Sequence, residues 1–300
     1  MRLLPIAEAI SDDAVPLWLL GAVAIRATPR VLDELARHPD IRRIDATPPV
    51  IASTLASAGT PPAASTAPRR VGWPGRDTGS VGITLLDTGL DPSVASRFGD
   101  VVACGARGRV SPRRVIADRH GHGSILSATL GRRAQGAPLS AARVLPGGRG
   151  TVAQVIGGLQ WALESGSPVI VTPLGRGAFD PLWHRVSWAL TAAGTSWVVE
   201  ADESDVGVHP SIHLPVVGCF RSGPLRTAVQ AASPWHVDTE PDAATALIEA
   251  GNAESTAARV ALTVASLKAL GPVSDPLELA RLLWATGEGA MARPSPSWAA

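Results

Sequence analysis

Between residues 81 and 202, short apolar segments alternate with segments of helical spacing, and few folds accommodate this pattern. The apolar segments, which we interpret as buried strands, are 81–89, 139–146, 167–175 and 195–202. The segments with helical spacing are 121–133, 151–166 and 180–194. Strands separated by helices indicate a mostly parallel sheet covered on both faces. We therefore expect an α/β fold with functional side chains at the carboxyl ends of its strands.

The pattern continues toward the C-terminus and also occurs in a smaller unit at the N-terminus. Residues 214–220 predict a further strand, and 254–270 and 275–286 predict helices. In the smaller unit, 21–27 predicts a strand, and 28–39 predicts a helix that starts at a Thr-Pro pair. Residues 40–50 predict a second strand with Ile41 and Ile44 pointing inward. The N-terminal unit is thus expected to be a small α+β module.

A stretch of low complexity separates the two units. Residues 53–72 are rich in Ala, Ser, Thr and Pro and show no strand or helix periodicity, which is typical of a flexible linker. We therefore divide the chain into a module over 1–52, a linker over 53–72 and a main α/β domain over 73–300. A main unit of that size is normal for one domain.

Composition excludes several functional classes. The 300-residue chain is 45% hydrophobic and 18% charged, as expected for a packed soluble protein, and its net charge of +1 does not indicate a nucleic-acid-binding protein. The two cysteines, Cys104 and Cys219, are too few for a disulfide framework, and we expect both to be reduced and buried.

No segment of the sequence is expected to span a membrane. The longest apolar run near the start, 15–25, is too short, and Asp12 and Asp13 precede it where a secretory signal carries positive charge. We expect a cytoplasmic protein, or a secreted one if the start site is mis-assigned.

Three polar residues stand where nucleophilic catalysis would need them. Asp87 ends the strand in "LLDTGLDPS", His122 opens a helix in "DRHGHGSILSATLG", and Ser255 opens another in "GNAESTAARVA". A serine hydroxyl needs a histidine to take its proton and a carboxylate to orient the histidine, and Asp, His, Ser is a known chain order. The alternatives are structural: a turn residue at Asp87 and helix caps at His122 and Ser255.

These motifs together resemble the subtilisin-like serine proteases. "ITLLDTGLD" is similar to the aspartate motif of that family, "DRHGHGSILSATLG" to its histidine motif, and "LPVVGCF" to a later strand. "GAVAIRATPRVLDELARHPDIRRIDATPPV" looks like its inhibitor-type propeptide. The resemblance implies a three-layer fold, catalysis by Asp87, His122 and Ser255 without a cofactor or metal, and a propeptide-like module that covers the main domain's substrate site.

The chain departs from the family pattern around the nucleophile. The family motif Gly-Thr-Ser-x-Ala-Ala-Pro corresponds to "GNAESTAARVA", which places either Ser255 or Glu254 at the nucleophile position. Asp202 takes the oxyanion position, where most of the family has Asn and where an aspartate can donate only when protonated. By the same resemblance, the substrate would be lined by Leu174, Gly175, Glu200 and Ala201.

Three hypotheses for function follow. The first is a divergent serine endopeptidase that cleaves a peptide or protein, with no nucleic-acid or membrane partner. The second is a pseudoprotease that binds a peptide or partner without cleaving it. The third is a structural or assembly protein in which Asp87 and His122 are relics.

Overall fold

The computed structural model of the chain describes residues 3–10, 13–52, 78–173, 181–201, 217–221, 226–231, 244–249, 256–271, 273 and 278–279. Its α-helices are α1 (Leu3–Ile10), α2 (Pro29–Ala36), α3 (His122–Arg133), α4 (Val152–Glu164), α5 (Pro181–Ala192) and α6 (Thr256–Leu270). Three short 3-10 helices are η1 (Trp18–Leu20), η2 (Ala95–Arg97) and η3 (Pro146–Gly148). Its strands are β1 (Val15–Leu17), β2 (Ala22–Ala24), β3 (Pro49–Ile51), β4 (Ile83–Asp87), β5 (Phe98–Cys104), β6 (Val110–Pro112), β7 (Leu139–Arg143), β8 (Arg149–Thr151), β9 (Val169–Pro173), β10 (Ser196–Ala201), β11 (Val217–Arg221), β12 (Arg226–Ala231) and β13 (Ala244–Glu249).

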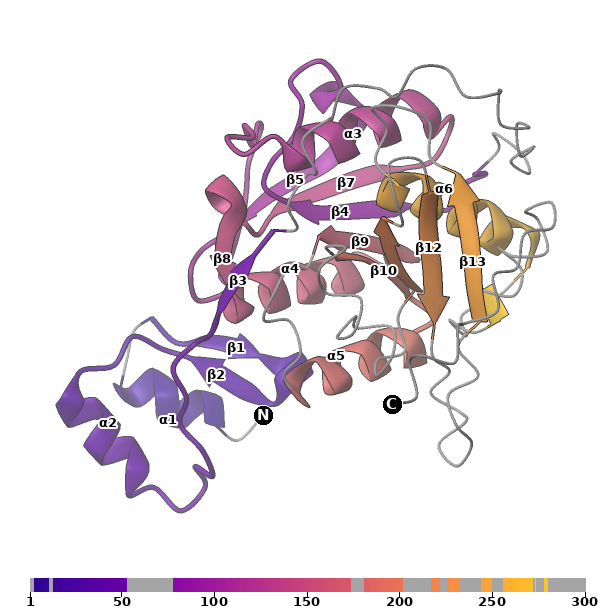
Figure 1. The fold of residues 1–300 in the computed structure, drawn as a ribbon. Coiled ribbons are helices and arrows are strands. Elements are labelled where there is room, and N and C mark those ends of the chain that lie inside the picture. The colour runs from indigo at the N-terminus through magenta and orange to yellow at the C-terminus, as the bar shows by residue number, and fades with distance from the viewer. Residues whose placement is uncertain are drawn as a thin grey trace.

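A nine-stranded sheet forms the centre of the molecule, in the order β13-β12-β11-β10-β9-β4-β7-β5-β6. The six strands from β11 to β5 in this order run parallel, whereas β6, β12 and β13 pair antiparallel at the two ends. Figure 1 shows β4 and β7 near the middle of this sheet. The expected α/β class with a mostly parallel central sheet is confirmed.

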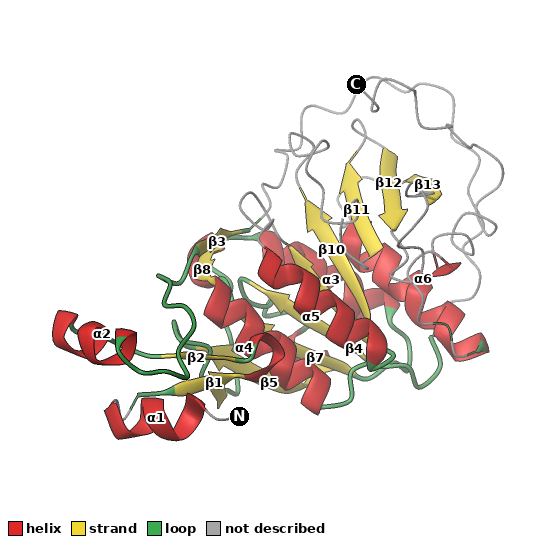
Figure 2. Ribbon diagram, turned by 90° about the horizontal axis from the view of Figure 1, so that it is seen from below, coloured by secondary structure: helices red, strands yellow, loops and turns green. Residues whose placement is uncertain are grey.

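Two hydrophobic cores lie on opposite faces of the sheet, so the fold has three layers. Successive residues of a strand point to opposite faces, and β4 shows the consequence: Ile83 and Leu85 join one core, whereas Leu86 joins the other. The first core contains Leu126 of α3 together with much of α6, and the second contains Ile156 of α4 together with residues of α5. Helices therefore cover both faces, as Figure 2 shows.

The N-terminal residues pack on the second core. β1, η1 and β2 form an antiparallel hairpin, and the side chains of η1 join the same core as α4 and α5. The side-chain amide of Gln160 on α4 donates to the Pro16 carbonyl, at 3.2 Å, and Trp18 Nε1 donates to Glu164, at 2.9 Å. β3 then leaves this unit and pairs antiparallel with β8 (Figure 1). The proposed domain limits remain a prediction, because 53–72 lies outside the described residues.

The structure corrects one predicted element. The stretch 40–50 was expected to be a strand with Ile41 and Ile44 facing inward, but the strand is only Pro49–Ile51, and Ile44 is 42% exposed. The pattern Ile41–Ile44 has a spacing of three, which does not place both side chains on one face of a strand. The predicted helix over 28–39 is confirmed as α2, with Thr28 accepting at its N-cap from the backbone N–H of Val31.

The prediction for one of the two cysteines is confirmed. Cys104 is buried with a free thiol, and desolvation raises the pKa of that thiol to about 12, so it stays protonated. The side chain of Cys219 lies outside what the structure describes. In the described part of the chain, no helix is both long and apolar enough to cross a membrane.

Candidate active site

Asp87 stands at the point where the strand order of the sheet reverses. It is the last residue of β4, and after β4 the chain places β5 and β7 on one side of that strand, then β9 and β10 on the other. In open α/β sheets, such a switch point at the carboxyl ends of the strands is where ligands and catalytic groups gather. The topology therefore gives Asp87 a position suited to chemistry.

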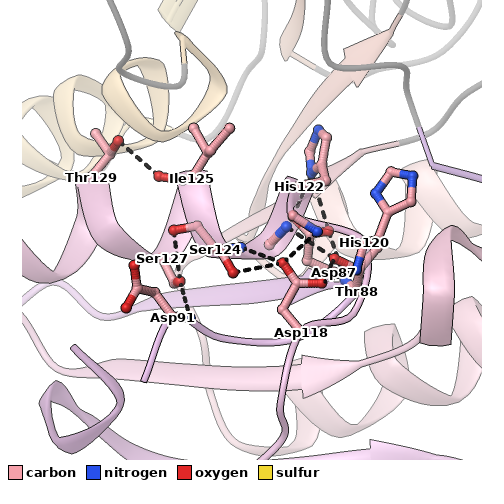
Figure 3. Close-up of polar contacts among 12 residues, drawn as sticks. Asp87, Thr88, Asp91, Asp118, His120, His122, Ser124, Ile125, Ser127 and Thr129 are labelled. Atoms are coloured by element: carbon pink, nitrogen blue, oxygen red, sulfur yellow. Dashed lines mark hydrogen bonds and ion pairs between the residues drawn. The ribbon is translucent and has the colours of Figure 1, made fainter. Parts of the chain in front are cut away.

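His122 meets Asp87 from the first turn of α3. Its Nδ1 lies 2.9 Å from Oδ2 and 3.1 Å from Oδ1 of Asp87, and both side chains are 1% exposed (Figure 3). The contact is a hydrogen bond in which Nδ1 donates when it carries the proton and a carboxylate oxygen accepts. In the neutral ring this tautomer leaves the lone pair on Nε2. Asp87 thus fixes both the orientation and the tautomer of the imidazole.

Thr88 connects the strand that carries Asp87 to the helix that carries His122. Its backbone N–H donates to Asp87 Oδ1 at 2.6 Å, which is a second hydrogen bond to the carboxylate besides the one from the histidine. Its hydroxyl accepts from the Gly123 N–H at 2.9 Å and donates to Asp118 Oδ1 at 2.8 Å. This fully buried side chain therefore contacts both segments that form the Asp–His pair.

Asp118 accepts five hydrogen bonds, from the two residues before α3, from the first turn of α3 and from Thr88. Its donors are the backbone N–H groups of His120 (2.8 Å), Gly121 (3.0 Å) and Ser124 (2.7 Å) and the hydroxyls of Ser124 (2.8 Å) and Thr88 (2.8 Å). Burial raises the pKa of this carboxyl, but the hydrogen bonds from His120, Ser124 and Thr88 outweigh it and lower the pKa to about 2. Asp118 is therefore ionised at neutral pH.

The segment that contains β3 is joined to the loop before β8, and this loop contacts His120. A Cβ atom at Gly148 would lie 2.3 Å from Cδ2 of His120, so the exposed His120 ring rests against that glycine. Gly148 directly precedes β8, and its carbonyl accepts from the N–H of Ala52 at 2.9 Å. The chain that leaves the N-terminal module at Ala52 is thus joined to the backbone that His120 touches.

The structure brings together only part of the predicted site. Asp87 and His122 are in contact, as described above. Glu200 and Ala201 end β10, where Glu200 pairs in register with Pro173 of β9, but their side chains are not described. The remaining residues of the prediction, all outside the described residues, are Leu174, Gly175, Asp202, Glu254 and Ser255.

Sequence reasoning missed Thr88 and Asp118. Thr88 was part of a "DTG" motif interpreted only through its aspartate. Asp118 had a usable signal, because an aspartate a few residues before a helix start is a common acceptor for the free N–H groups of the first turn. Gly121 occupies the N-cap position and has no side chain that could accept a hydrogen bond. Asp118, four residues before His122, accepts from the first turn of α3 in its place.

The arrangement matches the acid–base half of a nucleophilic site. A buried carboxylate orients an imidazole, and an imidazole in its neutral form can take a proton from a hydroxyl and return it to a leaving group. A hydroxyl nucleophile is not among the described residues at this pair.

No protein-family model matches the chain, and no curated protein matches its sequence. Among solved structures, its fold is similar to that of fervidolysin from Fervidobacterium pennivorans, described as a keratinolytic enzyme related to subtilisin. The match has a TM-score of 0.48 at 17% identity and covers 69% of this chain. It covers 38% of fervidolysin, so the chain spans well under half of that protein.

Proposed function

We propose that the protein is a divergent subtilisin-like serine endopeptidase that acts through Asp87, His122 and Ser255. The observation that carries the proposal is the hydrogen bond between His122 Nδ1 and Asp87 Oδ2, 2.9 Å long and fully buried. A buried Asp–His pair at the strand-order reversal of a parallel sheet is costly to maintain without a use, because its polar groups must be desolvated. General-base catalysis is a use that needs this geometry.

The reaction assigns one task to each member of the pair. His122 Nε2 takes the proton of the Ser255 hydroxyl as its oxygen attacks the peptide carbonyl, and later donates that proton to the leaving amine. Asp87 stabilises the imidazolium that exists between these two transfers. Water then releases the acyl group by the same steps, with His122 again as the base.

The assignment of the nucleophile and of the oxyanion donor rests on the sequence. In the sequence, Ser255 comes directly before Thr256, the first residue of α6. We therefore propose that the nucleophile lies at a helix N-terminus, where developing negative charge is favoured. Asp202 follows β10 directly and is the proposed oxyanion donor, active in its protonated form.

An extended peptide is the substrate class that the fold suits. β8 already pairs with an extended segment, β3, through antiparallel backbone hydrogen bonds, and one side chain of β3, Val50, is 1% exposed. Backbone pairing gives affinity for any extended chain, and buried side chains give selectivity. We propose that peptide substrates bind along the same edge and that the N-terminal module is its intramolecular occupant. By the resemblance to subtilisin-like proteases, Leu174, Gly175, Glu200 and Ala201 would also line the substrate.

The second candidate function is a pseudoprotease that binds a peptide without cutting it. The segment "GNAESTAARVA" favours it, because neither the threonine before the proposed serine nor the proline after it is present. In that case Glu254 takes the nucleophile position and cannot form the acyl intermediate through a serine oxygen.

A serine-reactive fluorophosphonate distinguishes the two candidates. If the proposal is right, the probe modifies Ser255, as located by peptide mass spectrometry, and His122→Ala reduces the labelling rate at least about a hundredfold. Ser255→Ala provides the blank. No labelling of the folded wild-type chain, together with retained peptide binding by calorimetry, would reject the peptidase and leave the binding protein.

A further inference from the structure

Asp118 accepts hydrogen bonds from residues on both sides of His122. The backbone N–H groups of His120 and Gly121 precede the histidine, and the backbone N–H of Ser124 follows it. The Ser124 hydroxyl adds a fourth bond, at 2.8 Å. Hydrogen bonds from the start of α3 thus converge on one carboxylate, as Figure 3 shows.

The fifth bond of Asp118 connects this turn to the strand end that carries Asp87. The Thr88 hydroxyl donates to Asp118 and accepts from Gly123, the residue directly after the histidine. The Thr88 backbone N–H in turn holds Asp87 Oδ1 at 2.6 Å. Both partners of the Asp–His bond are thus tied to one hydrogen-bonded unit, formed by Thr88 and Asp118.

We propose that Asp118 is a positioning residue that, acting through Thr88 and the first turn of α3, holds the His122 ring against Asp87. In its effect on catalysis the inference rests on the proposed function. Asp118 does not contact the ring of His122 through any bond described above, and its role is to set the backbone from which that ring projects.

The bonding pattern requires a carboxylate. Asp118 Oδ1 accepts two hydrogen bonds and Oδ2 accepts three, and all five donors are N–H or O–H groups. The side-chain amide of an asparagine has one accepting oxygen and two N–H donors. Its NH₂ group would therefore replace one of the two oxygens of Asp118 and point at N–H or O–H groups that are themselves donors. Asp118→Asn therefore changes the hydrogen bonding while keeping the size of the side chain.

The first test measures the hydrogen bond between His122 and Asp87 by NMR and does not depend on enzymatic activity. In the full chain labelled with ¹⁵N-histidine, the Nδ1 proton of His122 should give a far-downfield resonance, which His122→Gln identifies by its loss. We expect Asp118→Asn to abolish this resonance, because a displaced ring exposes the proton to exchange with water. Asp91→Asn is the matched control, since the carboxylate of Asp91 bonds the side chain and backbone N–H of Ser93 in its own turn, and should leave the resonance unchanged.

A second pair of variants covers the case in which Asp118→Asn does not fold. Thr88→Ser keeps the hydroxyl that connects Asp118 to Gly123, whereas Thr88→Val keeps the shape and removes the hydroxyl. We expect the His122 resonance in Thr88→Ser and its loss in Thr88→Val. Circular dichroism and thermal melting of each variant establish that the chain is folded.

The outcomes separate the inference from the proposed function. A folded Asp118→Asn variant with the His122 resonance of the wild type overturns the inference, as does an unchanged resonance in Thr88→Val. If the wild type hydrolyses peptides, Asp118→Asn should lower kcat by roughly tenfold to a hundredfold with little change in KM. If the wild type hydrolyses nothing, the proposed function fails, and the resonance alone still decides whether Asp118 positions His122.

Discussion

A Cβ atom added at Gly123 would lie 2.2 Å from the carbonyl oxygen of Gly89. The turn after Asp87 and the first turn of α3 therefore meet backbone to backbone, at a distance that only glycine permits. Gly89 in turn lies against the backbone of Asp118, to which its own Cβ would approach within 2.5 Å. The Asp–His pair depends on this close approach, because a wider spacing would separate His122 from Asp87.

Gly123→Ala should separate these two segments. The added methyl must push the backbone of Gly89 away, and overpacking of this kind costs about 1–3 kcal/mol in the free energy of unfolding. Chemical denaturation measures the loss. Gly99→Ala is the matched control, because the nearest atom to its Cβ is 4.0 Å away, and it should be nearly neutral. Equal stability of the two variants would contradict the close approach.

Val50→Asp should release β3 from β8. Val50 is 1% exposed in the second core, and an aspartate there would be a buried unpaired charge. We expect hydrogen exchange at the backbone N–H groups of Ala52 and Val152, which bond across this pair of segments, to become at least about tenfold faster. Ile51→Asp, on the same strand at a side chain 45% exposed, should leave exchange unchanged. Similar acceleration in both variants would argue against the burial of Val50.

Asp118→Asn should change the pH dependence of stability. The pKa of Asp118 is lowered to about 2 in the folded chain, below the value of about 3.9 in an unfolded one. The ionised carboxylate therefore stabilises the fold above the unfolded pKa, and the stabilisation is lost as the pH falls through the folded pKa. The stability difference between wild type and variant should be constant above about pH 5 and shrink from about pH 4 to pH 2.

Denaturant titrations at several pH values measure this difference. Asp45→Asn is a suitable control, because its ion pair with Arg43 is exposed and contributes little. A stability difference for Asp118→Asn that does not shrink in acid would contradict the role of the ionised form.

Leu86→Ala should strongly destabilise the fold. Leu86 is fully buried in the strand that ends at Asp87, and removing a buried leucine side chain costs about 2–5 kcal/mol. Leu270→Ala, at a side chain 84% exposed, should change the free energy of unfolding by less than about 0.5 kcal/mol. Thermal or chemical unfolding of both variants makes the comparison. Equal effects would contradict the placement of β4 between two cores.

If the chain is an active peptidase, it should cleave itself in the linker region. Exposed stretches rich in small polar residues are preferred cleavage sites, and we expect a cut between roughly residues 51 and 75. Intact mass spectrometry of the purified chain detects the product. Ser255→Ala should remain intact under the same conditions. Cleavage in both chains would identify a contaminating protease, and an intact wild type that hydrolyses added peptides would show that processing is not required.

Local sequence patterns were sufficient to predict most helices and parallel strands, because each element carries its own periodicity. The run that becomes β4 has apolar residues on both faces, Ile83 and Leu85 on one and Leu86 on the other, since both faces of that strand are buried. The Thr-Pro pair at Thr28 begins a helix as expected. The same reasoning placed Asp87 at a strand end and His122 at a helix start. A pattern formed by residues close in sequence can be interpreted without knowing which other segments pack against them in the fold.

Other features depended on segments far apart in sequence. β3 was predicted too long and without its partner, because its partner, β8, lies about a hundred residues away. Thr88 and Asp118 were not recognised, since their importance lies in hydrogen bonds between two loops that meet only in the folded chain. The sequence alone therefore determined which residues end strands and begin helices. The tertiary structure decided that Asp87 and His122 are buried and in contact, because only packing of the two loops excludes water and fixes the distance between them.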